Sequence, residues 1–79
     1  MLKPALAKVL KRLREEKRLS QDEFAHRAEV HRTYVSQLER GLKSPTLDTL
    51  ALICGVLEIP LSDLLRQVED EMAAMSREK

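Results

Sequence analysis

Residues 21–41, with the sequence QDEFAHRAEVHRTYVSQLERG, contain two short helical patterns separated by a break at residues 29–31. Apolar residues recur in both patterns at the spacing of one helix face, and they are Phe24, Ala25, Ala28, Val35 and Leu38. In the second pattern, over residues 32–40, polar residues cover an arc of about 140° on the opposite side. The stretch therefore predicts two packed helices, the second of which turns a polar face outward.

The residues beside these helices carry the signals that begin and end them. Ser20 and Glu23 fit a capping box, in which the Ser20 side chain accepts from the Glu23 N–H and the Glu23 side chain bonds back to the Ser20 N–H. Gly41 suits the left-handed conformation that often follows a helix. Residues 44–45, Ser-Pro, predict a turn before Thr46, which is a good N-cap for the next helix.

Two further helices are expected around this stretch. A helix over residues 4–17 begins at Pro4, whose missing N–H is not needed in a first turn. Another covers residues 47–57 and contains Gly55, which costs roughly 1 kcal/mol against Ala and indicates that another backbone packs close to it. The apolar stripe of this helix is Leu47, Leu50, Ile53 and Leu57.

Pro60 ends that helix, and a last helix is expected over residues 61–75. Its apolar residues recur in the heptad spacing of a helix seam, and they are Leu61, Leu65, Val68, Met72 and Met75. This seam is the expected dimer interface; the alternative is that it packs on the first helix of its own domain. Leu64, beside the seam, is expected to face the core, and the polar residues 76–79 are expected to fray.

Length and composition restrict the class of protein. With 79 residues the chain is long enough for one compact domain, so residues 1–79 are expected to form a single all-α domain. The single cysteine, Cys54, lies in an apolar run, which favours a buried thiol over a reactive one. Because the sequence predicts no intramolecular disulfide, signal peptide or membrane span, we expect a cytoplasmic protein without metal or cofactor.

The net charge of +1 hides an uneven distribution along the chain. Residues 1–43 contain eleven Lys or Arg and six Asp or Glu, whereas residues 44–79 contain three and seven. A basic half is expected when one surface of a protein meets a polyanion. Lys8, Lys11 and Arg12 are equally consistent with an ordinary solvated helix surface.

The runs SQDEFA, TYVSQLERG and SPTLDTL, within the helical pattern of residues 4–67, resemble the five-helix DNA-binding domain of the Xre/Cro-type helix-turn-helix family. This family includes phage repressors and the controller proteins of restriction-modification systems; the HRTYVS run and the short chain are most similar to the controller proteins. The resemblance implies that residues 21–40 form the helix-turn-helix. It also implies that the helix over residues 32–40, the recognition helix, enters the major groove of DNA.

The recognition helix carries side chains suited to contacts with bases. A major groove about 12 Å wide admits one helix, and side chains at its N-terminal end and outward face reach the base edges. Here these are Arg32, Thr33 and Gln37. Arg32 can donate two hydrogen bonds to a guanine, Gln37 can pair with an adenine, and the Thr33 methyl can touch a thymine methyl.

The resemblance also implies contacts to the DNA backbone on both sides of the recognition helix. The positions that match phosphate contacts in relatives are Gln21, Arg40 and Lys43. Tyr34 and Ser36 are less specific candidates: the Tyr34 ring is expected to pack with its hydroxyl toward a phosphate, and plain packing is an equally open alternative. His31 opens the recognition helix and is expected either to cap it or to touch DNA.

Two further features follow from the resemblance. It implies a partly buried ion pair between Arg14 and Glu39, in which removal of one partner costs roughly 3–5 kcal/mol if burial is deep. Relatives often have glycine at three turn positions where this chain has Arg18, Glu29 and Glu58. A left-handed non-glycine residue costs about 1–2 kcal/mol, so these residues either bear that strain or lie in different turns.

These observations predict a sequence-specific transcriptional regulator that binds a palindromic site in double-stranded DNA as a homodimer. The alternative is an antitoxin-type DNA-binding protein whose last helix binds a toxin. RNA polymerase stays open as a partner, and the sign of regulation is not determined. An enzymatic function is disfavoured, because the sequence has no glycine-rich phosphate loop and no paired-carboxylate, Cys/His or Ser/His constellation on a common face.

Overall fold

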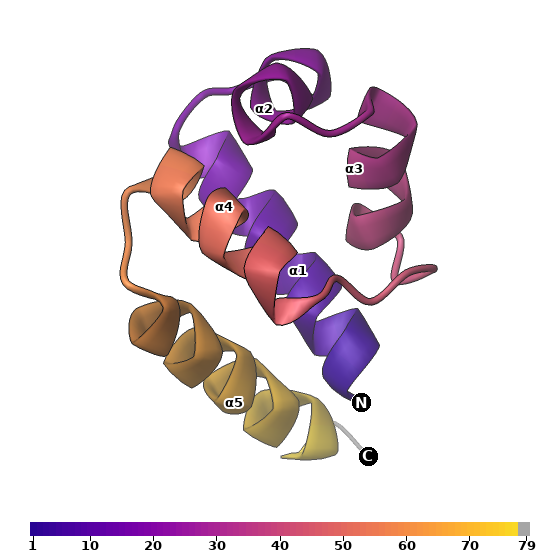
Figure 1. Ribbon diagram of the computed structural model, residues 1–79. Helices are drawn as coiled ribbons and strands as arrows, with labels where there is room; N and C mark the ends of the chain where they lie inside the picture. Colours follow the sequence, from indigo (N-terminus) through magenta and orange to yellow (C-terminus); the bar gives the residue numbers. More distant parts are fainter. Residues whose placement is uncertain (78–79) are drawn as a thin grey trace.

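The computed structural model describes residues 1–77, and within this range the chain forms five helices and no strand (Figure 1). They are α1 (Leu2–Glu16), α2 (Gln21–Ala28), α3 (Arg32–Glu39), α4 (Leu47–Leu57) and α5 (Leu61–Arg77). The predicted all-α, five-helix architecture is confirmed. Over the same residues, no helix combines the length and the apolar character needed to cross a membrane.

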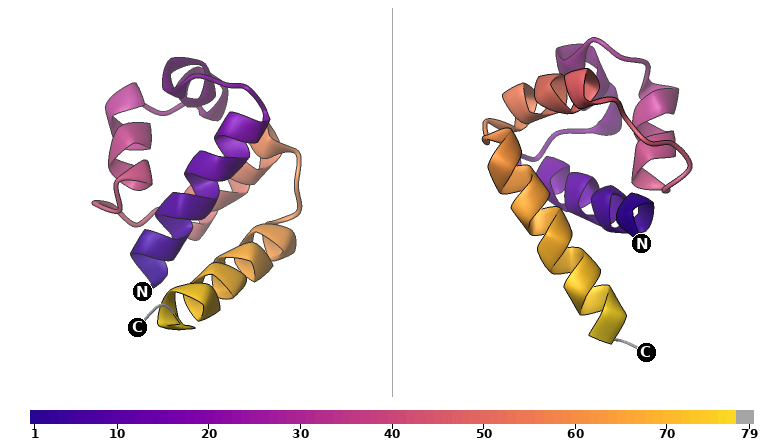
Figure 2. Two further views of the ribbon diagram at one scale, coloured as in Figure 1. Left: turned by 180° about the vertical axis from the view of Figure 1, so that it is seen from behind. Right: turned by 60° about the horizontal axis from the view of Figure 1, so that its bottom comes forward.

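The helices pack around one core with α1 at its centre. α1 lies between α3 and α5 and contacts both, while α2 packs against α3 and α4 (Figures 1 and 2). All five helices contribute apolar side chains to the core, and the largest fully buried ones are Val9, Leu10, Phe24, Val35, Ile53, Leu57, Leu64 and Val68. The α2–α3 pair is thus attached to the rest of the domain through both α1 and α4.

The helix boundaries agree with the predicted ones to within one residue, except near the two ends of the chain. α1 begins at Leu2, because proline at position 4 is tolerated among the first helical residues, whose N–H groups have no helical partner. α5 continues through residues 76 and 77, so the fraying expected from residue 76 does not begin there. Residues 78 and 79, the rest of that expected tail, lie outside the described residues.

Both predicted N-caps are present. Ser20 Oγ accepts from the Glu23 N–H at 3.0 Å at the start of α2, and Thr46 Oγ1 accepts from the Thr49 N–H at 3.1 Å at the start of α4. The other half of the capping box is replaced: the Glu23 carboxylate lies 3.0 Å from Arg27, one turn along α2. Opposite charges four residues apart on a helix attract each other, which gives this carboxylate a partner on the helix surface.

Three turns contain a non-glycine residue in the left-handed region. Arg18, Glu29 and Glu58 have φ angles of 59°, 59° and 60°, so the chain bears the strain at all three positions where relatives often have glycine. Lys17 donates a hydrogen bond to the Glu58 carboxylate, and this contact lowers the pKa of Glu58. Gly41, with φ of 73°, ends α3 in the predicted left-handed conformation.

Leu47 lies at the N-terminal end of the apolar stripe of α4, lines the same apolar hollow as Leu50, and is 68% exposed. One expectation for α4 is wrong. No other backbone packs close to Gly55, since a Cβ at this position would meet no heavy atom within 4 Å beyond its chain neighbours and its own helix backbone. Cys54 is buried as predicted, and burial raises the pKa of its thiol.

The apolar seam of α5 packs mainly on its own domain, which is the alternative that the sequence left open beside a dimer interface. Val68 is 1% exposed and belongs to the core together with Leu64. The half-buried members of the seam, which pack against the same core, are Leu61, Met72 and Met75. Only Leu65 is exposed, at 39%. Apolar residues three and four apart fit one side of a helix whether the partner is a second copy or α1 of the same chain.

The substitution Glu29→Gly is expected to raise the melting temperature. Glu29 ends α2 with φ of 59° and ψ of 40°, a conformation that glycine adopts without the steric cost of a Cβ. Relief of about 1–2 kcal/mol exceeds the added entropy of glycine in the unfolded chain, about 0.4–1 kcal/mol. Thermal unfolding followed by circular dichroism measures the change.

Glu29→Ala is the matched control for this substitution. It removes the same carboxylate but keeps a Cβ in the left-handed conformation, so its melting temperature should not rise. An equal increase in both variants would attribute the effect to charge and not to the backbone.

Candidate nucleic-acid interface

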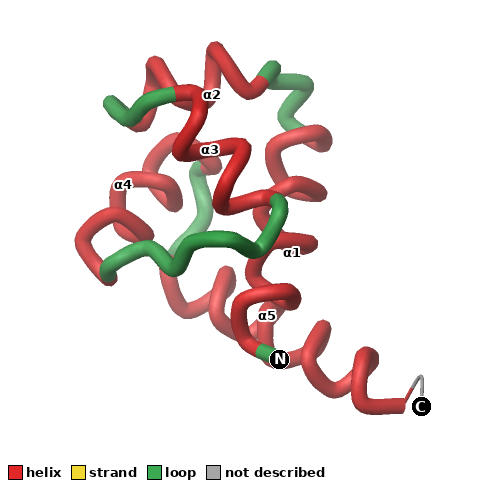
Figure 3. Tube along the Cα trace, turned by 90° about the vertical axis from the view of Figure 1, so that its right-hand side faces the viewer, coloured by secondary structure: helices red, strands yellow, loops and turns green. Residues whose placement is uncertain are grey.

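The polar face of α3 points away from the core. Val35 and Leu38 are 1% and 3% exposed, as predicted, and attach the helix to its neighbours. In Figure 3, α3 faces the viewer and no other helix lies in front of it. The predicted base contacts all belong to this outer side: Arg32 and Thr33 are exposed, and Gln37 is half-buried.

Arg32 has a partner that the sequence did not reveal. Its Nε lies 3.2 Å from Oδ1 of Asp22, in the first turn of α2, and the two side chains are 64% and 78% exposed. Asp22 and Arg32 lie in different helices on either side of a turn, so neither periodicity nor a motif relates them. The contact follows from the angle at which α2 and α3 meet.

The residues predicted to contact phosphates differ in whether their side chains already have a partner within the domain. Arg40 and Lys43, at and after the end of α3, are exposed and pair with no carboxylate of residues 1–77. Gln21 instead donates its side-chain amide to Glu39 Oε1 at 3.0 Å. The anion-binding group that Gln21 still offers is its backbone N–H at the positive end of α2.

The structure separates the remaining candidates on α3. Tyr34 is half-buried and packs against the core, as both of its expected roles require. Ser36 is half-buried on the same helix. His31 is exposed and occupies the N-cap position of α3, but its side chain makes no capping hydrogen bond. Of its two expected roles, contact with DNA is the one that stays open.

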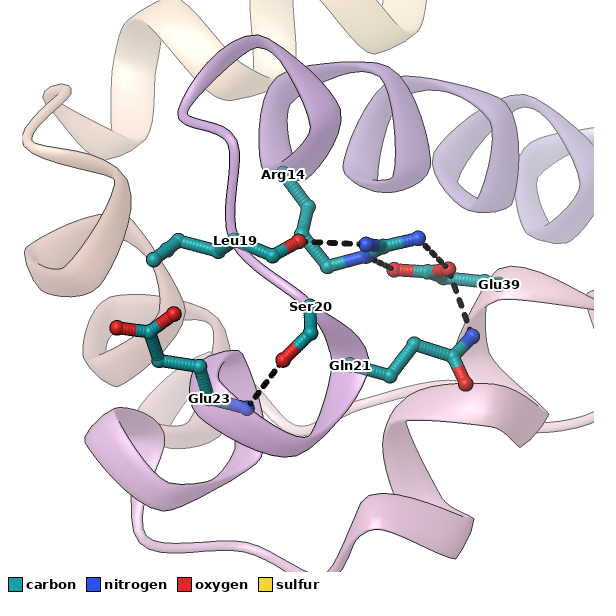
Figure 4. A network of polar contacts seen from close by, with 6 residues as sticks. All are labelled: Arg14, Leu19, Ser20, Gln21, Glu23 and Glu39. Atoms are coloured by element: carbon teal, nitrogen blue, oxygen red, sulfur yellow. Dashed lines mark hydrogen bonds and ion pairs between the residues drawn. The ribbon is translucent and has the colours of Figure 1, made fainter.

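A polar network joins α1, the start of α2 and the end of α3 (Figure 4). Arg14 Nε lies 2.6 Å from Glu39 Oε2, and Arg14 Nη2 donates to Glu39 Oε1 at 3.0 Å. Arg14 Nη1 donates to the backbone oxygen of Leu19 at 2.7 Å, and Gln21 adds the fourth contact. The side chains of Arg14 and Glu39 are 10% and 4% exposed, so this ion pair is almost fully removed from water.

This network keeps the Arg14 guanidinium charged and also holds the helices in place. The hydrogen bond to Glu39 raises the pKa of Arg14 above its ordinary value, so the guanidinium is charged at any pH at which the protein is folded. Within residues 1–77, no buried side-chain nitrogen or oxygen lacks a hydrogen-bond partner. Fully satisfied buried polar networks favour one arrangement of the elements they join, and here that arrangement holds α3 against α1.

Part of the basic N-terminal half is neutralised within the domain. Lys8 lies 3.2 Å and Arg12 3.6 Å from the Glu71 carboxylate, and Arg12 also donates to Gln67 at 2.9 Å. These contacts join α1 to α5, away from α3. Lys8 and Arg12 thus have partners within the domain, and the charge asymmetry along the chain overstates the basic surface.

Residues 1–77 contain no cluster of three or more His, Cys, Asp or Glu side chains placed to hold a metal ion. His26 and His31 are both exposed and lie on different helices or helix ends. The arrangement on the outer side of α3 consists of hydrogen-bond donors and cations on a convex helix surface. Such a surface suits recognition of a polyanion groove.

The substitution Glu39→Met is expected to destabilise the fold by roughly 3–5 kcal/mol, because it leaves the Arg14 charge buried without its counterion. Urea unfolding followed by circular dichroism gives the free energy of unfolding of each variant. The control is the double variant Arg14→Met with Glu39→Met, which removes both charges and should regain a large part of the loss. A double variant as unstable as the single one would show that shape, and not the stranded charge, is responsible.

Comparison with known proteins agrees with this geometry. The sequence profile of a family described as helix-turn-helix matches residues 10–64. Control protein C.MunI of Mycoplasma sp is 43% identical over 63 residues, which cover 78% of this chain and 85% of that protein. The transcriptional regulator ClgR of Mycobacterium tuberculosis is 38% identical over 55 residues, and this chain spans 49% of its length.

Solved structures share the same fold. ClgR from Corynebacterium glutamicum has a TM-score of 0.94 at 31% identity, over 99% of this chain and 83% of that one. The controller protein C.Esp1396I, solved as a tetramer with its natural operator, has a TM-score of 0.84 at 29% identity, over 92% and 96%. C.Esp1396I was also solved with single substitutions of an Arg, a Thr and a Tyr that are consecutive in its chain. The present chain therefore belongs to the Xre/Cro-type helix-turn-helix family, whose members among these relatives are transcriptional regulators and restriction-modification controller proteins.

Proposed function

We propose that this protein is a transcriptional regulator that binds a palindromic operator as a homodimer, with α3 of each subunit in the major groove. The observation that carries the proposal is the exposed polar face of α3 on a helix pair that a buried ion pair holds in place. The operator complex of C.Esp1396I, which has the same fold, supports it. In such a dimer the two α3 helices occupy successive major grooves about 34 Å apart.

The base contacts come from Arg32, Thr33 and Gln37. The tripeptide Arg-Thr-Tyr occurs once in this chain, at residues 32–34, and matches the three consecutive residue types substituted in C.Esp1396I. This match supports a role for the start of α3 in the interface. Arg32 pairs with a guanine, Thr33 contacts a thymine methyl, and Gln37 pairs with an adenine, with about 1–3 kcal/mol of discrimination for each bidentate pair.

The phosphate contacts flank α3. Arg40 and Lys43 hold the backbone beside its C-terminal end, and the Gln21 N–H binds a phosphate at the N-terminus of α2. His31 and Ser36 lie between these points and add donors along the same path. Such contacts carry little sequence information but set the register of α3 on the duplex.

We place the dimer interface at an apolar patch that consists of Leu2, Pro45, Leu47 and Leu65. Its three leucines are 58%, 68% and 39% exposed, and they surround an apolar hollow of about 210 Å³ whose floor includes Leu6. Full burial of one leucine side chain contributes about 1.5–3 kcal/mol, so three of them supply a substantial driving force for association. Pro45 belongs to the segment between α3 and α4, so pairing through this patch also sets the distance between the two α3 helices.

The antitoxin alternative finds no support among the relatives, which are control proteins, transcriptional regulators and a phage immunity repressor. Because these relatives are regulators, they also favour a non-enzymatic role for this chain. We place its action in the cytoplasm, where a bacterial or phage operator lies.

Selection from random duplexes with the 79-residue chain is expected to enrich a palindromic site. With Arg32→Ala, the enriched site should lose its preference for guanine at one position of each half-site. Lys43→Ala is the control: it should weaken binding about equally on all sequences and reduce the salt slope by about 1. Equal, weak binding of the unchanged protein to all duplexes would contradict the proposed function.

The double substitution Leu47→Glu with Leu65→Glu is expected to convert the dimer to a folded monomer, because it places charges in the apolar patch. Sedimentation equilibrium measures the mass of the variant in solution, and circular dichroism shows whether it is still folded. Leu52→Glu is the matched control, since Leu52 is 52% exposed on α4 but outside the patch. A double variant that remains dimeric would exclude this patch as the interface.

A further inference from the structure

We propose that Asp22 is a positioning residue, which orients Arg32 for a guanine and keeps it from binding phosphates without regard to sequence. The inference rests on the proposed function, in which Arg32 contacts a base. It starts from the 3.2 Å contact between Arg32 Nε and Asp22 Oδ1 across the turn that joins α2 and α3.

The atoms used in this contact leave the guanine-binding end of Arg32 unoccupied. A guanidinium has five N–H donors in a planar fork. Asp22 takes the Nε side of the fork, whereas two parallel hydrogen bonds to guanine O6 and N7 can be made by the two terminal nitrogens. The carboxylate therefore restricts the side-chain torsions of Arg32 without competing for the atoms that bind the base.

Asp22 is well placed to hold a negative charge at this position. It is the second residue of α2, which begins at Gln21 after the Ser20 N-cap. A carboxylate in the first turn is stabilised by the positive end of the helix.

The cations around α3 differ in whether they have an acidic partner. Arg40 and Lys43, which are proposed to bind phosphates, pair with no carboxylate within residues 1–77, whereas Arg32, which is proposed to bind a base, does. An unpaired cation gains from any phosphate through counterion release, whatever the sequence. The pairing of Arg32 thus reduces that sequence-independent contribution at the one cation that discriminates between bases.

The test is Asp22→Asn, measured on the site selected by the unchanged protein and on a scrambled duplex of the same length. We expect affinity for the scrambled duplex to rise about two- to fivefold and discrimination at the guanine position to fall by a similar factor, the range of an exposed ion pair. The salt slope on the scrambled duplex should increase by about 0.9, for one additional phosphate contact. Asp22→Glu keeps the carboxylate and should restore most of the discrimination.

Two controls separate the proposal from its alternatives. Asp48→Asn removes a carboxylate from the equivalent position of α4, two residues after the Thr46 N-cap, and should leave discrimination unchanged; an effect equal to that of Asp22→Asn would overturn the inference in favour of a general charge effect. In the Arg32→Ala background, Asp22→Asn should cause no further loss of base preference, and a further loss would also overturn it.

The outcomes also distinguish this inference from the proposed function. If Arg32→Ala abolishes the guanine preference and Asp22→Asn leaves it unchanged, the positioning role of Asp22 is wrong and the proposed function stands. If Arg32→Ala leaves the preference unchanged, Arg32 does not contact that base, and both the base contact and the inference fail.

Discussion

The presentation of α3 depends on the buried ion pair between Arg14 and Glu39. Transfer of two charges out of water is costly, and an ion pair offsets that cost only when its geometry is good and its remaining donors are satisfied. Here Arg14 makes two contacts with Glu39 and a third with the backbone of Leu19, and Gln21 adds a donor to the same carboxylate. The pair therefore fixes the end of α3 relative to both α1 and the start of α2.

Charged residues on the surface of the domain divide into two groups with different consequences. Lys8 and Arg12 on α1 share the single Glu71 carboxylate on α5, which offsets one of their two positive charges and joins the C-terminal helix to α1. Arg40 and Lys43 are not neutralised within the described residues and lie beside the outer face of α3. A net charge close to zero is thus compatible with a local cationic surface, because the potential that a polyanion meets depends on where the charges lie.

The C-terminal helix shows how one apolar pattern can serve two purposes. The inner residues of α5, among them Leu64 and Val68, complete a core that a chain of this size needs for stability. Leu65, one position away from Leu64, is exposed and joins Leu2 and Leu47 from two other helices in an apolar patch. If subunits associate through this patch, as proposed, folding and association use adjacent residues of the same helix.

The sequence by itself determined the helix content, the Ser20 and Thr46 caps and the inward faces of α2 and α3, because these depend on spacing and on local hydrogen bonds. The Arg14–Glu39 pair also followed from sequence, through residues matched to a family, whereas the left-handed conformation of Arg18, Glu29 and Glu58 was one of two alternatives that the structure decided. Only the tertiary structure decided that Val68 is buried, that Leu47 is exposed and that Arg32 meets Asp22. Those outcomes depend on which helices meet and at what angle, and no periodicity within one helix contains that information.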